Sequence, residues 1–319
     1  MEYKKPQATI IQGNVGIYPL TTADQVILAD GTRLEKDGKI NVDVANSAKL
    51  GGKAPEYYIQ PRNLLDNSDF RNPVNQRGFV NGNAVELYNY FIDRWISGES
   101  SINPSLNNNG IMPNGAFFQR LDNLSTYIGR NMTFAIGLSS GDIVIASGTL
   151  TDVSDNDITI FNTTDGQNEI SVGSDGGLWY VWINYPSSTI QWAALYEGSY
   201  TAETLPPYVP KGYAAELAEC QRYYQIIRLY RHLSTIYDNQ YRYYGCSLPV
   251  KMRTTPTVTI ESMDEFKVNS FDKNSLTSYS GESYSDFEGM AISFMCKSEF
   301  GTVQSQCYVS TKIACSADL

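Results

Sequence analysis

The pattern of apolar and polar positions predicts a chain built mainly from short β-strands. Between residues 61 and 210, stretches of alternating or continuous β-branched and aromatic residues are separated by clusters of Asn, Gly, Asp and Ser. No helical periodicity intervenes, which favours a β-sandwich or jelly roll over an α/β fold. The predicted strands are Phe79–Val85, Phe117–Leu121, Met132–Leu138, Ile143–Leu150, Ile158–Phe161, Leu178–Ile183 and Ile190–Leu195.

Residues 1–60 contain only short strand candidates, Ala8–Gln12, Gln25–Leu28 and Lys39–Val44, separated by Gly-Asn and Asp-Gly turns. So little continuous apolar sequence does not easily form a core alone. We expect this region to bury its apolar residues against other copies of itself or against a larger particle, as an attachment and oligomerisation segment.

One short helix is predicted after Pro210, because Tyr213, Leu217, either Cys220 or Gln221, and Tyr224 recur at helical spacing. Further strands follow, and a polar stretch rich in Ser and Tyr, Asn269–Ser285, is expected to form an exposed loop. The predicted strands are Arg242–Val250, Thr257–Ile260, Met290–Cys296 and Gln306–Ala314. The predicted fold is therefore mainly β, in three parts: residues 1–60, a sandwich domain at 61–210, and a β domain led by one helix at 211–319.

The composition is that of a globular protein, with 42% apolar and 18% charged residues among 319. A net charge of −10 and a pI near 4.7 disfavour nucleic acid and anionic membrane surfaces as partners. No apolar run approaches the roughly 20 residues of a membrane span, so membrane insertion is not expected. Residues 1–6 lack the apolar core of a signal peptide, which predicts synthesis in the cytoplasm.

The five cysteines predict buried thiols rather than a zinc site or a disulfide framework. They all lie in the last third of the chain, their number is odd, and no two have C-x-x-C spacing. Pairing of two of them outside the cell stays an open alternative. The cysteines are Cys220, Cys246, Cys296, Cys307 and Cys315.

No motif predicts an enzyme or a cofactor. Gly137 to Gly141 match the G-x-S-x-G pattern of a hydrolase nucleophile, but a strand follows from Asp142 where the motif requires a helix. A Ser-Gly hairpin explains the match. The single histidine, His232, does not form a multi-histidine metal site and is assigned a structural or surface role. No carboxylate pair is singled out for glycoside cleavage, and no solenoid repeat is found.

An oxygen-rich cluster gives a weak calcium candidate at Asp152, Asp155 and Asp157. Calcium requires six to eight oxygen ligands, and Ile158 occupies the position where an EF-hand loop has its glycine. Ordinary turn chemistry of Asp and Asn explains these residues better, so no metal site is predicted.

Exposed aromatic rings are the main candidates for ligand binding, because a flat ring stacks on the C–H face of a sugar. In the run Trp179 to Trp182, alternation places Trp179 and Val181 on one face and Tyr180 with Trp182 on the other. Since Val181 marks the buried face, Tyr180 and Trp182 are predicted to form an outward platform. Trp192 is a further candidate, whereas Trp95 is expected in the core.

The tyrosine-rich C-terminal region gives a second candidate surface. Tyr279 and Tyr284 lie in the predicted loop, and four more tyrosines precede it between residues 237 and 244. With 23 tyrosines in the chain, most are expected in cores and interfaces.

Several segments resemble bacteriophage fibre proteins. Residues 206–224 and 248–259 resemble the C-terminal module of phage fibre and receptor-binding proteins. Residues 45–58, with Leu50-Gly-Gly-Lys53, resemble a segment of tail-fibre shafts. The opening at 63–78, with Asp93-Arg-Trp95, resembles carbohydrate-binding-module-like jelly rolls in such fibres, as does the closing strand at 193–198.

This resemblance implies a homotrimeric fibre protein of a phage or prophage virion, made in the bacterial host cytoplasm. Its partners would be further copies of itself, other virion proteins through residues 1–60, and a host surface polysaccharide bound without covalent chemistry. One alternative is a structural head or tail fibre, or decoration protein, without receptor specificity; Val15–Ile27 resembles capsid-fibre openings. A glycan depolymerase is the other alternative.

Overall fold

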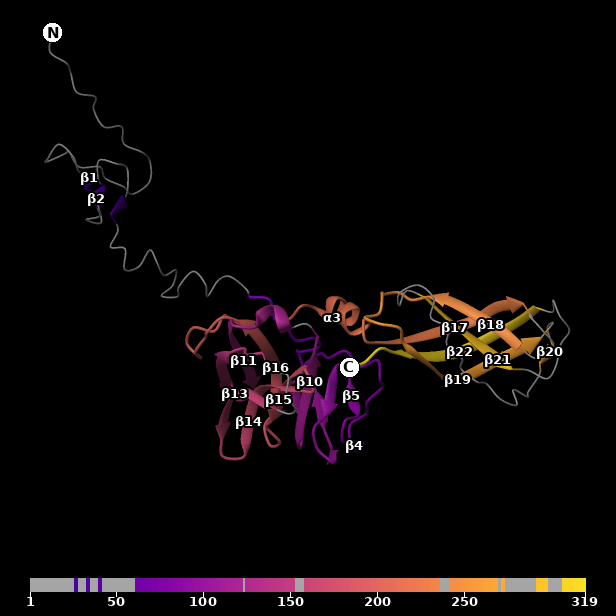
Figure 1. Cartoon of the computed structure of the whole chain (residues 1–319), viewed down its shortest axis with the longest axis horizontal. Helices are drawn as coiled ribbons and strands as arrows, with labels where there is room; N and C mark the ends of the chain where they lie inside the picture. The colour runs from indigo at the N-terminus through magenta and orange to yellow at the C-terminus, as the bar shows by residue number, and fades with distance from the viewer. Residues whose placement is uncertain are drawn as a thin grey trace, which may run out of the picture. The chain divides into compact units, whose positions relative to one another are not determined.

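The computed structural model describes most of the chain after residue 60 and three short strands before it (Figure 1). The described residues are 26–27, 33–34, 40–41, 61–122, 124–152, 158–235, 241–268, 271–272, 291–297 and 306–319, with side chains described at 61–122, 124–152, 158–230, 246–262 and 310–319. The chain divides into two compact units, Met1–Gln60 with Glu203–Pro207 and Pro61–Ala202 with Tyr208–Leu319.

The first unit contains a three-stranded antiparallel sheet of β1 (Val26–Ile27), β2 (Arg33–Leu34) and β3 (Ile40–Asn41). The strands β1 and β3 lie inside the segments predicted at Gln25–Leu28 and Lys39–Val44, so both predictions are confirmed. The prediction at Ala8–Gln12 lies outside the described residues.

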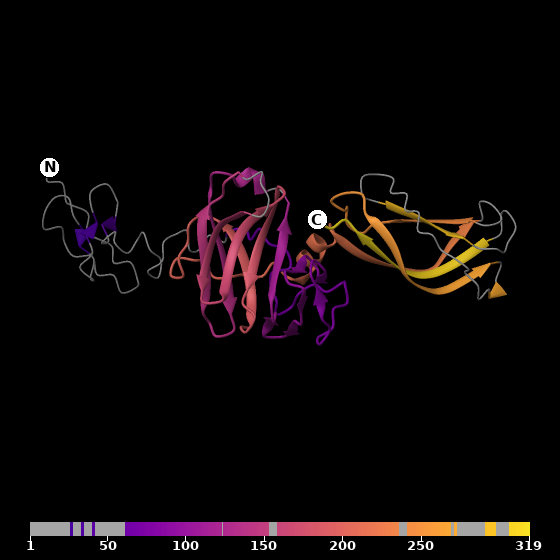
Figure 2. The same cartoon turned by 60° about the horizontal axis from the view of Figure 1, so that its bottom comes forward.

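Two antiparallel sheets pack face to face in the second unit (Figure 2). One has the strand order β13-β14-β15-β10-β6-β5, and the other has the order β12-β11-β16-β9-β8. The strands are β5 (Tyr90–Ile92), β6 (Trp95–Ser97), β8 (Ser105–Asn107), β9 (Gly110–Met112), β10 (Ala116–Leu121), β11 (Asn131–Leu138), β12 (Ile143–Thr149), β13 (Ile158–Asp165), β14 (Asn168–Asp175), β15 (Leu178–Asn184) and β16 (Ile190–Glu197). A separate ladder joins β4 (Val85–Glu86) to β7 (Ser101–Ile102).

The alternation of side chains along the strands builds the core between the sheets. In β15, Trp179, Val181 and Ile183 are buried, while Tyr180, Trp182 and Asn184 are half-buried on the opposite face. The predicted assignment of the two faces of this strand is therefore confirmed. The other sheet supplies core residues from β9, β11 and β16: Ile111, Met132, Phe134, Ile136, Ala193 and Leu195.

An aromatic cluster anchors residues 65–95 to the six-stranded sheet. Trp95 is fully buried, with its ring centroid 5.1 Å from that of Phe70 and 5.2 Å from that of Phe117. Its indole Nε1 donates a hydrogen bond of 2.8 Å to the carbonyl of Asn67, which satisfies the one polar atom that burial would otherwise leave unpaired. The prediction that Trp95 is a core residue is confirmed.

The C-terminal strands form a four-stranded and a two-stranded sheet. The long strand β22 (Gln306–Ser316) pairs with both β17 (Tyr224–Thr235) and β19 (Thr257–Val268), and β19 also pairs with β20 (Phe271–Asp272). The strand β18 (Tyr241–Ser247) pairs with β21 (Ala291–Lys297). The mainly β fold with one short α-helix in the described residues is confirmed.

The helix α3 (Tyr213–Cys220) is shorter than predicted, and its buried face differs. Tyr224, expected at its end, instead begins β17, and Tyr213 is 48% exposed. The buried positions are Glu216 and Cys220. Glu216 is turned inward because its Oε2 accepts a 2.6 Å hydrogen bond from the backbone N–H of Asn67, a tertiary contact that periodicity does not reveal.

Polar contacts join the sandwich to the strands after the helix. Arg77 makes two 2.7 Å hydrogen bonds to the carboxylate of Asp318. Its guanidinium carbon lies 4.0 Å from the ring centroids of Tyr90 and Tyr224, so it is held between two aromatic rings. The side chain of Gln76 donates to the Tyr224 carbonyl at 2.9 Å. This junction is therefore an ordered, largely buried interface.

The strand predictions need correction in several places. Most of Phe79–Val85 is irregular, and only Val85 belongs to a strand, because Asn and Gly at 81–83 interrupt the pairing. The polar strand β14 was missed, and so was β17, which was assigned in part to the helix. The short strands β2 and β5 to β9 were not predicted either. Cys220 and Cys315 are buried free thiols, as predicted, and burial raises the pKa of Cys315 to about 12, whereas the free thiol of Cys246 is only half-buried. The side chains of Cys296 and Cys307 lie outside the described residues. Among the described residues, no helix is long and apolar enough to cross a membrane.

Candidate functional site

The outward face of the six-stranded sheet carries a row of aromatic and polar side chains at matched register. Trp182 of β15 lies opposite Phe118 of β10 on one side and opposite Ser171 of β14 on the other. Tyr180 is likewise flanked by Arg120 and by a glycine of β14. Since directly opposed residues on paired strands share a face, these side chains converge on one surface.

The aromatic rings form the floor of this surface. The rings of Phe118 and Trp182 are stacked, with centroids 6.0 Å apart and an interplanar angle of 21°. Tyr180 and Tyr88 each pack edge to face against Phe118, with ring centroids 6.4 Å and 6.2 Å from that of Phe118, respectively. Tyr88 is 63% exposed, so the row extends to solvent at this end.

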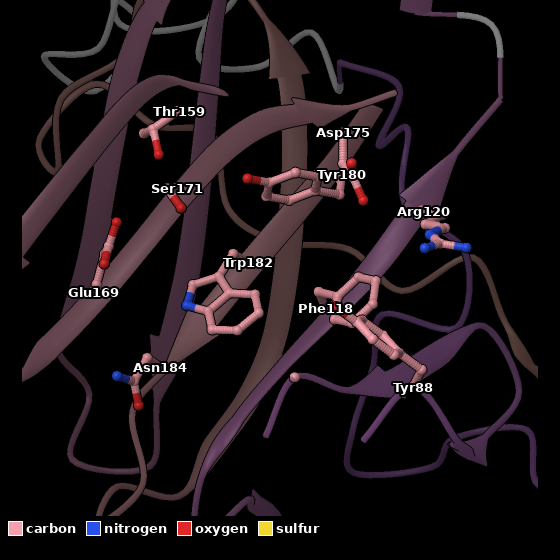
Figure 3. Close-up of a pocket in the computed structure, with 11 residues that line it drawn as sticks. Tyr88, Phe118, Arg120, Thr159, Glu169, Ser171, Asp175, Tyr180, Trp182 and Asn184 are labelled. Carbon is pink, nitrogen blue, oxygen red and sulfur yellow. The ribbon is translucent and has the colours of Figure 1, made fainter. Parts of the chain in front are cut away.

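A cavity of about 550 Å³ opens above these rings (Figure 3). Its remaining wall is polar and presents carboxylate, hydroxyl, amide and guanidinium groups. The polar lining residues are Arg120, Thr159, Glu169, Ser171, Asp175 and Asn184. This volume lies within the usual range for small-molecule sites, and an apolar floor with converging polar groups is their usual composition.

Two glycines fix the positions of the rings. A Cβ built at Gly98 would lie 2.5 Å from Trp182 Cη2, and one at Gly173 would lie 2.5 Å from Tyr180 Cζ. Both distances are far below van der Waals contact. The two rings therefore lie directly over backbone that only glycine provides, which makes the aromatic floor largely pre-formed.

Gly173→Ala is expected to displace Tyr180 and to lower the free energy of unfolding by about 1–3 kcal/mol. The new methyl group would also lie 2.8 Å from the carbonyl oxygen of Ile158 on the neighbouring strand. Denaturant unfolding measures the loss. Glu169→Ala, on the same strand and face, is the control and should cost under about 0.5 kcal/mol. Equal stability of the two variants would show that Tyr180 does not depend on this glycine.

The geometry suits stacking and hydrogen bonding with a sugar. The faces of Trp182 and Tyr180 can pack on pyranose C–H groups, while Asn184 and Ser171 can hydrogen-bond to hydroxyl groups. Glu169 is partly engaged, since its Oε1 accepts a 3.3 Å hydrogen bond from Asn162 Nδ2. The predicted pair Tyr180 and Trp182 is thus brought together in one cavity.

The remaining predicted site residues are not brought together here. Tyr279, Tyr284, Asp155 and Asp157 lie outside the described residues, and Asp152 is exposed. Within the part of the chain that the structure describes, no group of three or more His, Cys, Asp or Glu is placed to hold a metal ion. Trp192, the other candidate, is buried and stacks on Tyr208, with ring centroids 4.8 Å apart.

The G-x-S-x-G match lies in a hairpin, as predicted. The antiparallel pair β11 and β12 is joined by residues 139–142. Gly141 has a φ of 95°, and Ser140 Oγ donates a 2.8 Å hydrogen bond to Asp142 Oδ2. The local geometry is that of a turn between strands, not of a strand followed by a helix.

A scan against protein-family models, a search of curated proteins and a search of solved structures find no match to the chain. The chemistry of the site is therefore inferred from its own residues.

Sequence reasoning missed Phe118, Arg120, Glu169 and Ser171. In β10, Phe117 and Phe118 are consecutive, so the apolar run hides which ring points outward. The strand β14 carries polar residues at most outward positions and resembles a loop. Pairing with β15 places all four in the site: Phe118 and Ser171 lie opposite Trp182, Arg120 opposite Tyr180 and Glu169 opposite Asn184. The available signal was a polar strand next to an alternating one.

Proposed function

We propose that the chain is a fibre protein of a phage or prophage virion whose sandwich domain binds a host surface glycan, without covalent chemistry, in the cavity over Phe118, Tyr180 and Trp182. The observation that carries the glycan proposal is the pre-formed row of aromatic rings beneath a polar wall, in a cavity of about 550 Å³. Carbohydrates present alternating C–H faces and hydroxyl edges, and this surface is complementary to both.

The fibre assignment is supported by the segments that resemble phage fibre modules and by the β-rich build of the chain. A homotrimer attached to the virion through residues 1–60 would present three copies of the cavity. Single sugar contacts are weak, so several linked copies raise the overall affinity without any new contact.

Trp182→Ala is expected to weaken glycan binding by roughly 5- to 30-fold, because it removes stacking worth about 1–2 kcal/mol. A glycan array first identifies a ligand for the full chain, and titration calorimetry then measures the Kd of the wild type and of the variant. Tyr213→Ala is the matched control, since this ring is 48% exposed on α3 and lies outside the cavity.

Two outcomes would contradict the proposal. If no glycan binds the wild-type chain on the array, a structural fibre or decoration role is favoured instead. If Trp182→Ala and Tyr213→Ala bind equally well, the ligand lies elsewhere on the chain. Release of reducing ends from a host polysaccharide would show a depolymerase.

A further inference from the structure

A second cavity, of about 740 Å³, lies where the ends of β10 and β15 meet the residues that follow α3. Four arginines line it, Arg62, Arg94, Arg222 and Arg253, against two aspartates, Asp66 and Asp122. A net positive lining is unexpected in a chain whose net charge is −10. Arg62 and Arg94 come from the start of the sandwich sequence, Arg222 from the turn after α3 and Arg253 from the loop between β18 and β19, so only folding brings them together.

Two of the four arginines already have carboxylate partners. Arg94 Nε lies 3.1 Å from Asp66 Oδ2, and Arg253 Nε lies 3.2 Å from Asp122 Oδ2. Asp66 is shared, because Lys211 Nζ lies 3.8 Å from its other oxygen. Both aspartates are therefore already paired with cations, although Asp122 Oδ1 is buried without a hydrogen-bond partner among the described residues.

The other two arginines are uncompensated. Arg62 and Arg222 are exposed, and within the described residues neither has a carboxylate partner at ion-pair distance. Arg94, which lines the same cavity, is 1% exposed, and its Nη1 is buried without a hydrogen-bond partner among the described residues. A buried guanidinium nitrogen without an acceptor is rare in folded proteins and favours an added anion nearby.

We infer that this cavity binds an anionic group, a carboxylate or a phosphate ester, carried by an acidic glycan. The planar guanidinium group can donate bidentate hydrogen bonds to a carboxylate and to a phosphate. The aromatic walls Trp179, Tyr127 and Tyr223 provide ring surface next to the charges. That the anion belongs to a glycan rests on the proposed function, whereas anion binding itself does not.

The test is titration calorimetry of the full chain with three probes: trigalacturonate, glycerol 3-phosphate and the neutral maltotriose. We expect at least one anionic probe to bind, more weakly as the salt concentration rises, and the Arg62→Ala/Arg222→Ala double variant to weaken that binding at least tenfold. Both side chains are exposed and, within the described part of the chain, neither pairs with a carboxylate, so their removal leaves no described carboxylate without a partner. Binding of one anionic probe or both supports the inference and identifies which anion is preferred.

The matched control is Arg130→Ala, an arginine with a 52% exposed side chain outside the cavity. The inference is overturned if neither anionic probe binds at millimolar concentration, or if the double variant binds like this control.

Trp182→Ala separates the two proposals. If Trp182→Ala weakens glycan binding and the arginine variant does not, only the first cavity is supported; the reverse result supports only the second.

Discussion

Replacing Arg94 by alanine is expected to lower the free energy of unfolding by about 3–5 kcal/mol, the largest effect of any single substitution considered. The Arg94 side chain is 1% exposed, pairs with Asp66, donates a 2.7 Å hydrogen bond to the Arg120 carbonyl, and lies 3.4 Å over the Tyr223 ring. The substitution leaves a carboxylate and a carbonyl without their donor, and it opens a cavity between the sandwich and the C-terminal strands.

Chemical denaturation with guanidinium chloride measures this loss. Arg94→Met is the informative second variant, because it keeps most of the volume and removes the charge, its hydrogen bonds and the guanidinium contact with the Tyr223 ring. It should recover part of the stability. Arg130→Ala, which breaks an exposed ion pair with Glu197, should cost under about 1 kcal/mol. An Arg94→Ala variant as stable as Arg130→Ala would show that the junction does not depend on this guanidinium.

The chain is expected to become more stable as the pH falls from 8 to 5, because two buried carboxyl groups bind protons more tightly in the folded state. Burial raises the pKa of Glu216 to about 7, although Lys211 and the Asn67 N–H oppose the shift. Its Oε1 has no hydrogen-bond partner, which adds to the cost of the charged form. A raised pKa means that protonation stabilises the fold, and this contribution disappears as the pH rises through about 7.

Asp93 contributes in the same direction. Burial raises its pKa to about 6, against the charge of Arg77 and two hydrogen bonds from Gln76. Its contribution is fully present below its unfolded pKa near 4 and is lost as the pH rises through about 6. Together the two groups should make the free energy of unfolding roughly 2–4 kcal/mol larger at pH 5 than at pH 8.

Denaturant titrations between pH 5 and 8 measure how the free energy of unfolding changes with pH, and this slope checks the prediction. Glu216→Gln should remove more than half of it, whereas Glu197→Gln, an exposed carboxylate, should leave it unchanged. A histidine ordinarily titrates within this pH range, so His232→Gln, which replaces the single histidine of the chain, is a second control. A slope of the opposite sign, or one abolished by His232→Gln, would contradict the assignment to the buried carboxyl groups.

Much of the fold could be predicted because alternation is a local signal. The run Trp179 to Trp182 identified the buried face of β15 and placed Tyr180 and Trp182 on the outer face, where they line the cavity. The Ser-Gly hairpin after β11 was equally local. Such patterns depend only on the pleat of a strand and on turn chemistry.

The predictions from the sequence failed where contacts between distant residues override the local preference for a helix, strand or loop. The strand β14 has few apolar residues, and its place between β13 and β15 makes it a strand. Glu216 faces inward because Asn67, 149 positions away in the sequence, donates to it. Tyr224 continues a helical spacing but pairs with Ser316 as part of a sheet.

The sequence by itself determined the mainly β class, the one short helix of the described residues and the outward platform of Tyr180 and Trp182, because each follows from spacing between near neighbours. Only the tertiary structure decided that Phe118 and Ser171 join that platform, and that four arginines from distant segments line one cavity. The physical reason is that strand register and domain packing are set by contacts between residues far apart in the chain, which periodicity does not encode.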